Sequence, residues 1–331
     1  MAVLLTSGAR EIDLSDVTQT TSSTDSSDAW LGASSYWKPT HITISAWLGH
    51  APFAFWLVDA VRPRSIVELG THSGFSYFVF CEAAVRLGLD TRAYALDTWQ
   101  GDDQAGIYGE DVFDSVNAIN NSDYSSFSTL LRGYFDDSLA SIADGSVDLL
   151  HIDGRHGFED VTHDFAAWLP KLSNRGVAIF HDIAEHQEGF GVWRFWEMVK
   201  KEYPSFEFEH SHGLGVLGVG PDLPPTMQAF FAAAADSPDR VRAVYERLGI
   251  EIEQLAALHG RAQQAEALAI EVAASDEALR QVQTELRDAR TRFAAAEADV
   301  TGLRQHLLAL QTSTSWAVTR PLRAIGARLK S

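Results

Sequence analysis

The chain has 331 residues, a hydrophobic content of 46% and a formal net charge of -19. The length suits one catalytic domain with an appendage, or two modest domains, and the apolar content is ample for a packed core. Nucleic acid is disfavoured as the main partner, because phosphate binding needs a basic surface and this chain is strongly acidic. The single cysteine, Cys81, cannot form an internal disulfide, which indicates a reducing compartment.

The first 62 residues divide into a polar arm and an apolar segment. Residues 15–28 are polar and of low complexity, so we predict a flexible arm over residues 1–35. Residues 36–62 carry apolar side chains at helical spacing and predict one or two helices that cap the edge of a sheet. No basic segment precedes a sustained apolar run, and no run approaches ~20 residues, so neither a signal peptide nor a membrane-spanning helix is predicted. We therefore expect a cytoplasmic location.

Residues 64–74 are the most informative stretch of the sequence. A strand at Ile66–Leu69 is followed by Gly70 and Gly74, and an apolar helical pattern then begins. Glycine in such a strand–turn–helix lets a ligand approach the backbone closely. A second strand, Tyr94–Leu96, ends in Asp97, whose carboxylate can accept hydrogen bonds from both hydroxyls of a ribose. The two motifs together predict a nucleoside-binding α/β domain.

The glycine spacing limits which nucleoside is bound. The dinucleotide motif needs a second glycine two residues after the first, whereas Thr71, His72 and Ser73 follow Gly70 here. The sequence also contains no phosphate-binding loop of the Gly-x-x-x-x-Gly-Lys-Ser/Thr type. A nucleoside cofactor without phosphate is therefore favoured.

Three further strands are predicted after a long polar insertion at residues 99–124. They are Leu130–Gly133, Asp148–Asp153 and Val177–His181, and helical stretches separate them. This alternation predicts a parallel sheet with right-handed crossovers, in which ligands bind beyond the carboxyl ends of the strands. Four acids fall at that edge: Glu68, Asp97, Asp153 and Asp182.

Two of these acids lie next to histidines. The fourth strand ends in His151-Ile-Asp153-Gly-Arg-His156, and the fifth ends in His181-Asp182. Hard divalent cations take such carboxylates together with water and substrate, and can lower the pKa of a substrate hydroxyl. Neutral His156 is the candidate base that takes the proton. The alternative is that the acids only cap the following helices.

The C-terminal third has a different pattern. Residues 223–264 predict a helical connector, and residues 265–311 predict a coiled coil, because apolar residues from Leu279 to Leu310 alternate spacings of three and four. A coiled coil implies self-association or a helical partner; the alternative is a helix that packs onto the preceding domain. The tail, residues 312–331, contains Trp316 and four basic residues and no acid, which is typical of peripheral contact with an anionic membrane or of docking onto an acidic partner.

The motif Glu68-x-Gly70-x-x-x-Gly74 resembles the first motif of class I S-adenosylmethionine-dependent methyltransferases, which have a Rossmann-like sheet with helices on both faces. The run from His151 to His156, followed by Asp164, Trp168, Leu172, Gly176 and His181-Asp182, resembles a bacterial family of these enzymes associated with cell-surface polysaccharide assembly. That family is similar to metal-dependent macrolide-sugar O-methyltransferases and to cephalosporin-hydroxylase-like proteins. The resemblance covers residues 36–222.

The resemblance implies roles for individual residues. Glu68, Gly70, Thr71, Gly74 and Asp97 would bind S-adenosylmethionine. Asp136 and Asp137 would approach its adenine, and Asp102 and Asp103 the acceptor. Asp153 and Asp182 match metal-ligand positions, with Mg²⁺ as the expected ion. His181 as the third ligand would favour Mn²⁺ or Fe²⁺.

The hypothesis from sequence is an S-adenosylmethionine-dependent O-methyltransferase that acts on a sugar hydroxyl in cell-surface glycan biosynthesis. The coiled coil would dimerise it or tether it to a partner. One alternative is a non-catalytic coiled-coil scaffold of a polysaccharide-assembly complex. Another is a metal-dependent oxygenase or hydrolase that uses Asp153, His181 and Asp182.

Overall fold

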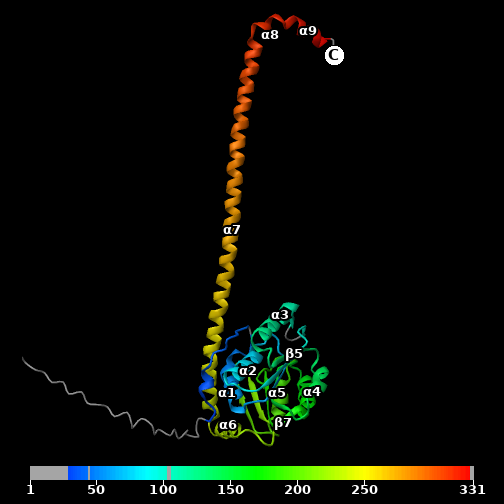
Figure 1. Ribbon diagram of the computed structural model, residues 1–331, viewed down its shortest axis with the longest axis vertical. Helices are drawn as coiled ribbons and strands as arrows, with labels where there is room; N and C mark the ends of the chain where they lie inside the picture. The colour runs from blue at the N-terminus through cyan, green and yellow to red at the C-terminus, as the bar shows by residue number, and fades with distance from the viewer. Residues whose placement is uncertain (1–28, 44, 103–105, 329–331) are drawn as a thin grey trace, which may run out of the picture. The chain divides into compact units, whose positions relative to one another are not determined.

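A computed structural model describes residues 29–43, 45–102 and 106–328 (Figure 1). The chain forms two compact units, one that ends at His259 and one that begins at Gly260. The first unit contains a seven-stranded sheet in the order β5-β2-β1-β6-β7-β9-β8. Strands β5, β2, β1, β6 and β7 are parallel, and β9 is antiparallel to both of its neighbours. The predicted α/β sheet is confirmed.

The five predicted strands all form, with bounds that shift by one residue at the fourth and extend five residues further toward the N-terminus at the fifth. They are β1 (Ser65–Leu69), β2 (Arg92–Asp97), β5 (Ser128–Arg132), β6 (Val147–Ile152) and β7 (Leu172–His181). Strands β8 (Ser205–Phe208) and β9 (Leu214–Gly218) extend the sheet beyond β7. The polar insertion folds into a short hairpin of β3 (Gly101–Asp102) and β4 (Gly106–Ile107), helix α3 (Glu110–Ile119) and a π-helical turn, Asn120–Tyr124.

Helices cover both faces of the sheet, because side chains of successive strand residues point to opposite faces. Ile66 of β1 packs in one core with α1 (Ala51–Val61), α2 (Phe75–Arg86), α6 (Pro225–Asp236) and the start of α7 (Pro238–Thr312). Val67 packs in the opposite core with α4 (Phe158–Trp168) and α5 (Val192–Val199). Helix α1 therefore lies on a face of the sheet and does not cap an edge, contrary to the prediction. Ten of its eleven residues are buried, which requires other elements to pack around the whole helix.

Part of the predicted N-terminal arm belongs to the core. Trp30 is 1% exposed, and the Tyr245 hydroxyl donates a hydrogen bond of 2.6 Å to its backbone carbonyl. The Ser35 side chain is also buried and lies 3.1 Å from the same hydroxyl. A flexible arm over residues 1–35 is thus wrong for residues 29–35, since a large indole is buried there. Residues 1–28 lie outside the described part of the chain.

The predicted connector is also part of the folded unit. Met227 and Phe230 of α6, and Val241 and Tyr245 of α7, are fully or almost fully buried. Phe53 of α1 contacts the Tyr245 ring edge-on at a centroid distance of 5.3 Å. Residues 225–236 and 238–259 are helical. Their apolar side chains recur at helical spacing and help complete the core of the first unit.

The second unit is helical. It consists of α7 from Gly260 onward, α8 (Thr314–Val318) and α9 (Arg320–Arg328). In α8, the Trp316 indole is 42% exposed, and the guanidinium carbon of Arg323 lies 3.7 Å from its ring centroid. The basic tail as a membrane contact stays a prediction. No helix in the described ranges combines the length and apolar character needed to cross a bilayer.

Candidate active site

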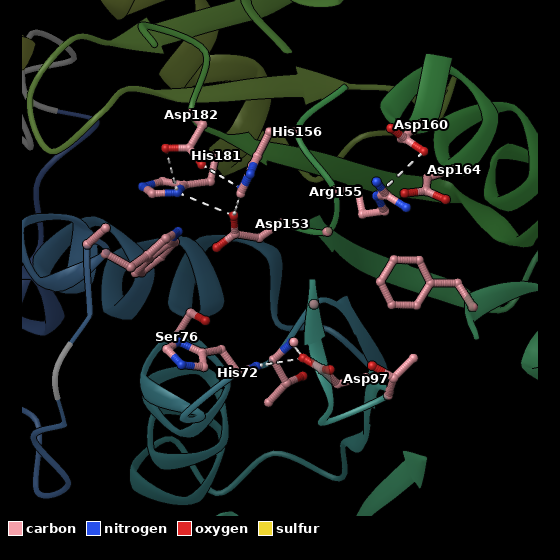
Figure 2. Close-up of a pocket in the computed structure, with 18 of the residues that line it drawn as sticks. His72, Ser76, Asp97, Asp153, Arg155, His156, Asp160, Asp164, His181 and Asp182 are labelled. Atoms are coloured by element: carbon pink, nitrogen blue, oxygen red, sulfur yellow. Dashed lines mark hydrogen bonds and ion pairs between the residues drawn. The ribbon is translucent and has the colours of Figure 1, made fainter. Parts of the chain in front are cut away.

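The loops that follow the parallel strands enclose a cavity of about 880 Å³ at their carboxyl ends (Figure 2). Its walls come from the residues after β1, β2, β5, β6 and β7, and from one face of α4. Seven carboxylates line it: Asp97, Asp136, Asp153, Glu159, Asp160, Asp164 and Asp182. A cavity at the point where neighbouring crossovers diverge is the general ligand site of open α/β sheets.

The loop after β1 forms one wall and depends on Gly70. This residue has φ +88°, and a Cβ there would lie 2.0 Å from the backbone oxygen of Asp153. The loops after β1 and β6 can therefore touch only because position 70 has no side chain. Gly74, with φ +82°, starts α2 in the same left-handed region. Gly70 and Thr71 line the cavity, as the sequence predicts for a cofactor loop.

Asp97 holds this loop in place. One of its carboxylate oxygens accepts hydrogen bonds from the backbone amides of Thr71 (2.9 Å) and His72 (2.8 Å). The other accepts a bond of 2.7 Å from the backbone amide of Trp99. His72 and Trp99 both have positive φ, 47° and 50°, so the carboxylate stabilises a strained backbone. Asp97 lines the cavity, but its first task is structural; a carboxylate has about four acceptor positions, so capacity for a ligand remains.

Glu68 does not reach the cavity. Its side chain is completely buried, and one oxygen lies 2.7 Å from Nδ1 of His151, its register partner on β6. Burial raises the pKa of Glu68, and the contact with His151 opposes that rise. Glu68 therefore contacts His151 on the neighbouring strand and not the predicted cofactor. Side chains alternate along a strand, and this alternation turns Glu68 toward the face of the sheet that α1 and α2 cover.

A cluster of two carboxylates and two histidines lies at the ends of β6 and β7 (Figure 2). Nε2 of His156 is 2.9 Å from Asp182, and Nδ1 of His181 is 3.3 Å from Asp153 and 3.4 Å from Asp182. Ligand atoms of Asp153, His181 and Asp182, one from each, lie within 4.8 Å of one another. That spacing suits three ligands around a single divalent ion.

The far nitrogen of His181 fixes which atom faces the cluster. Nε2 lies 3.0 Å from the backbone carbonyl of Ser211, which can only accept, so Nε2 carries the proton. In its neutral form, His181 would therefore offer the lone pair of Nδ1 to a cation held by Asp153 and Asp182. A histidine oriented through its second nitrogen by a carbonyl is the usual support of a metal-binding imidazole. The residues present fit a divalent cation.

The same contacts set the charges of the cluster. Burial alone would lower the pKa of His156 and of His181, but the two aspartates outweigh it and raise both to about 10. Hydrogen bonds from the histidines, acting against burial, lower the pKa of Asp182 to about 2. With no cation in the cluster, His156 is therefore protonated at neutral pH and cannot take a proton from an acceptor. Its ring also stacks on Phe190 at 4.7 Å.

The opposite end of the cavity is formed by α4 and the loop after β5. Asp136 lines the cavity there, and His163 Nε2 is 2.9 Å from its carboxylate. Asp160 and Asp164, one helical turn apart, also face the cavity, and Asp160 lies 4.0 Å from Arg155. Burial raises the pKa of Asp164 to about 7. No role was predicted for Asp160; the signal in the sequence is two acids four residues apart on the helix after β6.

Other predicted residues lie elsewhere. Asp137 does not line the cavity. Asp102 is in β3, without a described side chain, and Asp103 lies outside the described residues. Trp47, from the apolar segment at residues 36–62, is 1% exposed and also contributes to the cavity wall, with its ring centroid 6.4 Å from that of His181.

Comparison with known proteins agrees with this architecture. Residues 67–183, from β1 to the end of β7, match a family model described as a methyltransferase domain. Over 179 residues the chain is 53% identical to the uncharacterized protein y4gI of Sinorhizobium fredii. The match covers 54% of this chain and 20% of that protein, so the chain spans about a fifth of the length of this relative.

Solved structures of methyltransferases are similar at low identity. The O-methyltransferase TomG of Streptomyces achromogenes, in complex with SAM, is 16% identical, with a TM-score of 0.40 over 59% of this chain and 98% of that chain. An O-methyltransferase of Bacillus cereus, in complex with SAH, is 18% identical, with a TM-score of 0.40 over 54% of this chain and 84% of that chain.

Proposed function

We propose that this chain is an S-adenosylmethionine-dependent O-methyltransferase that acts on a sugar hydroxyl in the biosynthesis of a cell-surface glycan. The observation that carries the proposal is the arrangement of one cavity: a glycine loop lies on one side, and the cluster of Asp153, His181 and Asp182 lies on the other. The family match of residues 67–183 supports the reaction class.

The glycine loop is the part that would hold the cofactor. Gly70 and Thr71 offer backbone at the cavity wall without an intervening side chain, and Asp97 fixes their geometry. The loop has no glycine two residues after Gly70 to admit a pyrophosphate, which favours a nucleoside without phosphate. At the other end of the cavity, Asp136 and Asp164 can accept hydrogen bonds from a purine amino group.

The carboxylate–histidine cluster is the part that would hold a divalent cation, through Asp153, Asp182 and Nδ1 of His181. Such an ion supplies positive charge that lowers the pKa of an acceptor hydroxyl. Methyl transfer breaks the methyl–sulfur bond, forms a methyl–oxygen bond and releases the hydroxyl proton. His156, 2.9 Å from Asp182, is placed to receive that proton once it is neutral.

The sugar acceptor rests on the resemblance of the His151–His156 and His181-Asp182 motifs to glycan-modifying methyltransferases. A hydroxyl acceptor is favoured, because the cluster would hold a cation beside His156, which could act as a base once neutral. Neither feature would be needed for transfer to a thiol, which ionises near neutral pH without help.

Calorimetric titration of the full chain with S-adenosylmethionine and S-adenosylhomocysteine tests the cofactor. We expect one saturable site per chain, lost in Gly70→Ala, whose new methyl group would collide with the Asp153 carbonyl. Gly88→Ala is the matched control: position 88 also has positive φ, 59°, but a Cβ there meets nothing within 4 Å. Failure of folded wild-type protein to bind either compound would refute the methyltransferase proposal.

A separate experiment tests the cation. Titration with Mn²⁺, followed by its electron paramagnetic resonance signal, should show binding that is at least tenfold weaker in Asp182→Asn. Asp136→Asn is the control, because Asp136 lies at the opposite end of the cavity beside His163. If methyl transfer to simple glycosides continues in the presence of EDTA, the proposed cation is refuted, while the proposed cofactor site still stands.

A further inference from the structure

The second unit carries a long row of exposed apolar side chains along α7. From Leu279 to Leu310 they follow one another at alternating spacings of three and four residues, and Ser275 interrupts the row between Val272 and Leu279. The larger ones are 48–68% exposed. We name this row the α7 seam: Leu268, Val272, Leu279, Val282, Leu286, Ala289, Phe293, Ala296, Val300, Leu303, Leu307 and Leu310. Such a row at a spacing of 3.5 is the core of a coiled coil, with Leu279 at position a and Val282 at position d.

The charges beside the seam identify the occupant. In a parallel two-stranded coiled coil, position g of one helix faces position e five residues later on its partner. Here the g positions Glu285, Arg292 and Asp299 would face Arg290, Glu297 and Arg304 of a second copy, three pairs of opposite charge in succession.

The alternation of sign along the helix also fixes the register. A shift by one heptad would bring Glu285 against Glu297 of the second copy and Arg292 against Arg304. Like charges at these positions destabilise the pairing. Only the in-register alignment gives attraction at all three of these pairs.

Antiparallel pairing with a second copy fits less well. An alignment that pairs Val272 with Leu310 covers most of the seam, but it brings Arg292 against Arg292 and Glu285 against Asp299. An alignment that pairs Leu279 with Leu310 avoids these repulsions, but the partner helix then ends before Leu268 and Val272, which stay exposed.

We propose that residues 268–310 form a parallel, in-register, two-stranded coiled coil with a second copy of this chain. Ala289 and Ala296, on either side of Phe293, suit two strands, because small d residues allow close approach of two helices and would leave a cavity between three. This pairing is independent of the methyltransferase reaction.

Charge reversal tests the pairing in the full chain by sedimentation equilibrium. We expect a dimer that dissociates about tenfold more readily in Arg292→Glu, since two symmetry-related attractions become repulsions. The double variant Arg292→Glu/Glu297→Arg should regain the wild-type constant. Arg287→Glu, the same charge change at an outward b position, should have no effect. A monomer or trimer of the wild-type chain would overturn the proposal.

The double variant also decides orientation. In the antiparallel alignment that pairs Leu279 with Leu310, position 292 faces Asp299 and position 297 faces Arg290. There the second change, Glu297→Arg, would add a repulsion and would not remove one. Further weakening in the double variant would therefore refute parallel pairing.

Cysteine cross-linking gives an independent measure. Ala289→Cys should form an intermolecular disulfide with itself under mild oxidation, because identical residues meet in a parallel pair. In the antiparallel alignment that pairs Leu279 with Leu310, residue 289 of one chain faces residue 300 of the other. The two copies of residue 289 are then about 16 Å apart along the helix axis, which is too far for a disulfide. Cross-linking only in a mixture of Ala289→Cys and Val300→Cys would overturn the parallel arrangement. The wild-type chain is the control, since its one thiol, Cys81, is buried.

Discussion

Replacement of Asp97 by asparagine tests whether this carboxylate is a structural or a cofactor-binding group. The substitution keeps the size of the side chain but converts one oxygen to an amide nitrogen. Because one carboxylate oxygen accepts from Thr71 and His72 and the other from Trp99, any orientation of the new amide sets its nitrogen against a backbone donor. At least one charge-assisted bond is lost, and the others lose the benefit of the negative charge.

The expected loss of stability follows from these contacts. One charge-assisted hydrogen bond contributes about 1.5–3 kcal/mol, and weakening of the remaining bonds adds about 1 kcal/mol. Asp97→Asn should therefore unfold about 3 kcal/mol more readily than wild type. Asp90→Asn, an exposed aspartate near the start of β2, should change stability by less than about 0.5 kcal/mol.

Urea unfolding followed by tryptophan fluorescence measures this difference, since Trp99 lies inside the affected loop. Titration with S-adenosylhomocysteine at low urea then measures binding by the folded fraction. If Asp97→Asn is as stable as Asp90→Asn but no longer binds, the three backbone contacts contribute little and Asp97 acts mainly on the ligand. Loss of stability would mean that weakened binding in this variant cannot by itself establish a contact with ribose.

Two further predictions concern groups with defined surroundings. Burial raises the pKa of Asp164 to about 7 from an ordinary 3.8, so the fold disfavours its carboxylate and stability falls as pH rises from about 4 to about 7. Asp164→Asn cannot ionise and so avoids this loss of stability. The free energy of unfolding of the variant, measured relative to wild type in urea titrations, should therefore rise by up to about 4 kcal/mol between pH 4 and pH 8. A difference independent of pH would contradict the raised pKa of Asp164. Tyr245→Phe removes the hydroxyl that donates a hydrogen bond to the Trp30 carbonyl, so the free energy of unfolding should fall by about 1–2 kcal/mol. Residues 30–35 should then be cleaved faster in limited proteolysis, and an unchanged cleavage rate would contradict this role.

The strands and the edge that carries the acids could be predicted because they follow from local rules. A short apolar run with helical stretches on either side implies a buried parallel strand, and parallel strands place their last residues at one edge. Asp97, Asp153, His181 and Asp182 follow from that rule alone, and all four line the cavity.

The direction of a side chain at that edge could not be predicted as easily. Glu68 is one residue before the end of β1, and its position in the strand turns it toward His151. His72 and Trp99 adopt a positive φ, which brings their backbone amides to Asp97. Neither residue type ordinarily takes that conformation, so the sequence gives no sign of it.

Contacts between distant parts of the sequence were beyond any periodic pattern. Trp30 and Tyr245 are 215 residues apart and meet in one core. The repeat in α7 predicts a helix but does not show where burial ends, because apolar residues recur at helical spacing both in the part that completes the core and in the exposed seam. Tyr245 is 1% exposed, whereas Leu279, on the same helix, is 55% exposed.

The charge of the cavity limits what the proposed enzyme can accept. Seven carboxylates face the cavity, against Arg155 and four histidines that are positive only when protonated: His72, His156, His163 and His181. A cationic sulfonium and a divalent ion both reduce this negative charge, so each should bind more weakly as salt screens the field. A phosphate group would be repelled from the same space. Under the proposed function, a nucleotide-linked or lipid-linked sugar would therefore enter with its hydroxyl leading and its phosphates outside the cavity. The affinity of such acceptors should depend on the sugar ring more than on the phosphate carrier.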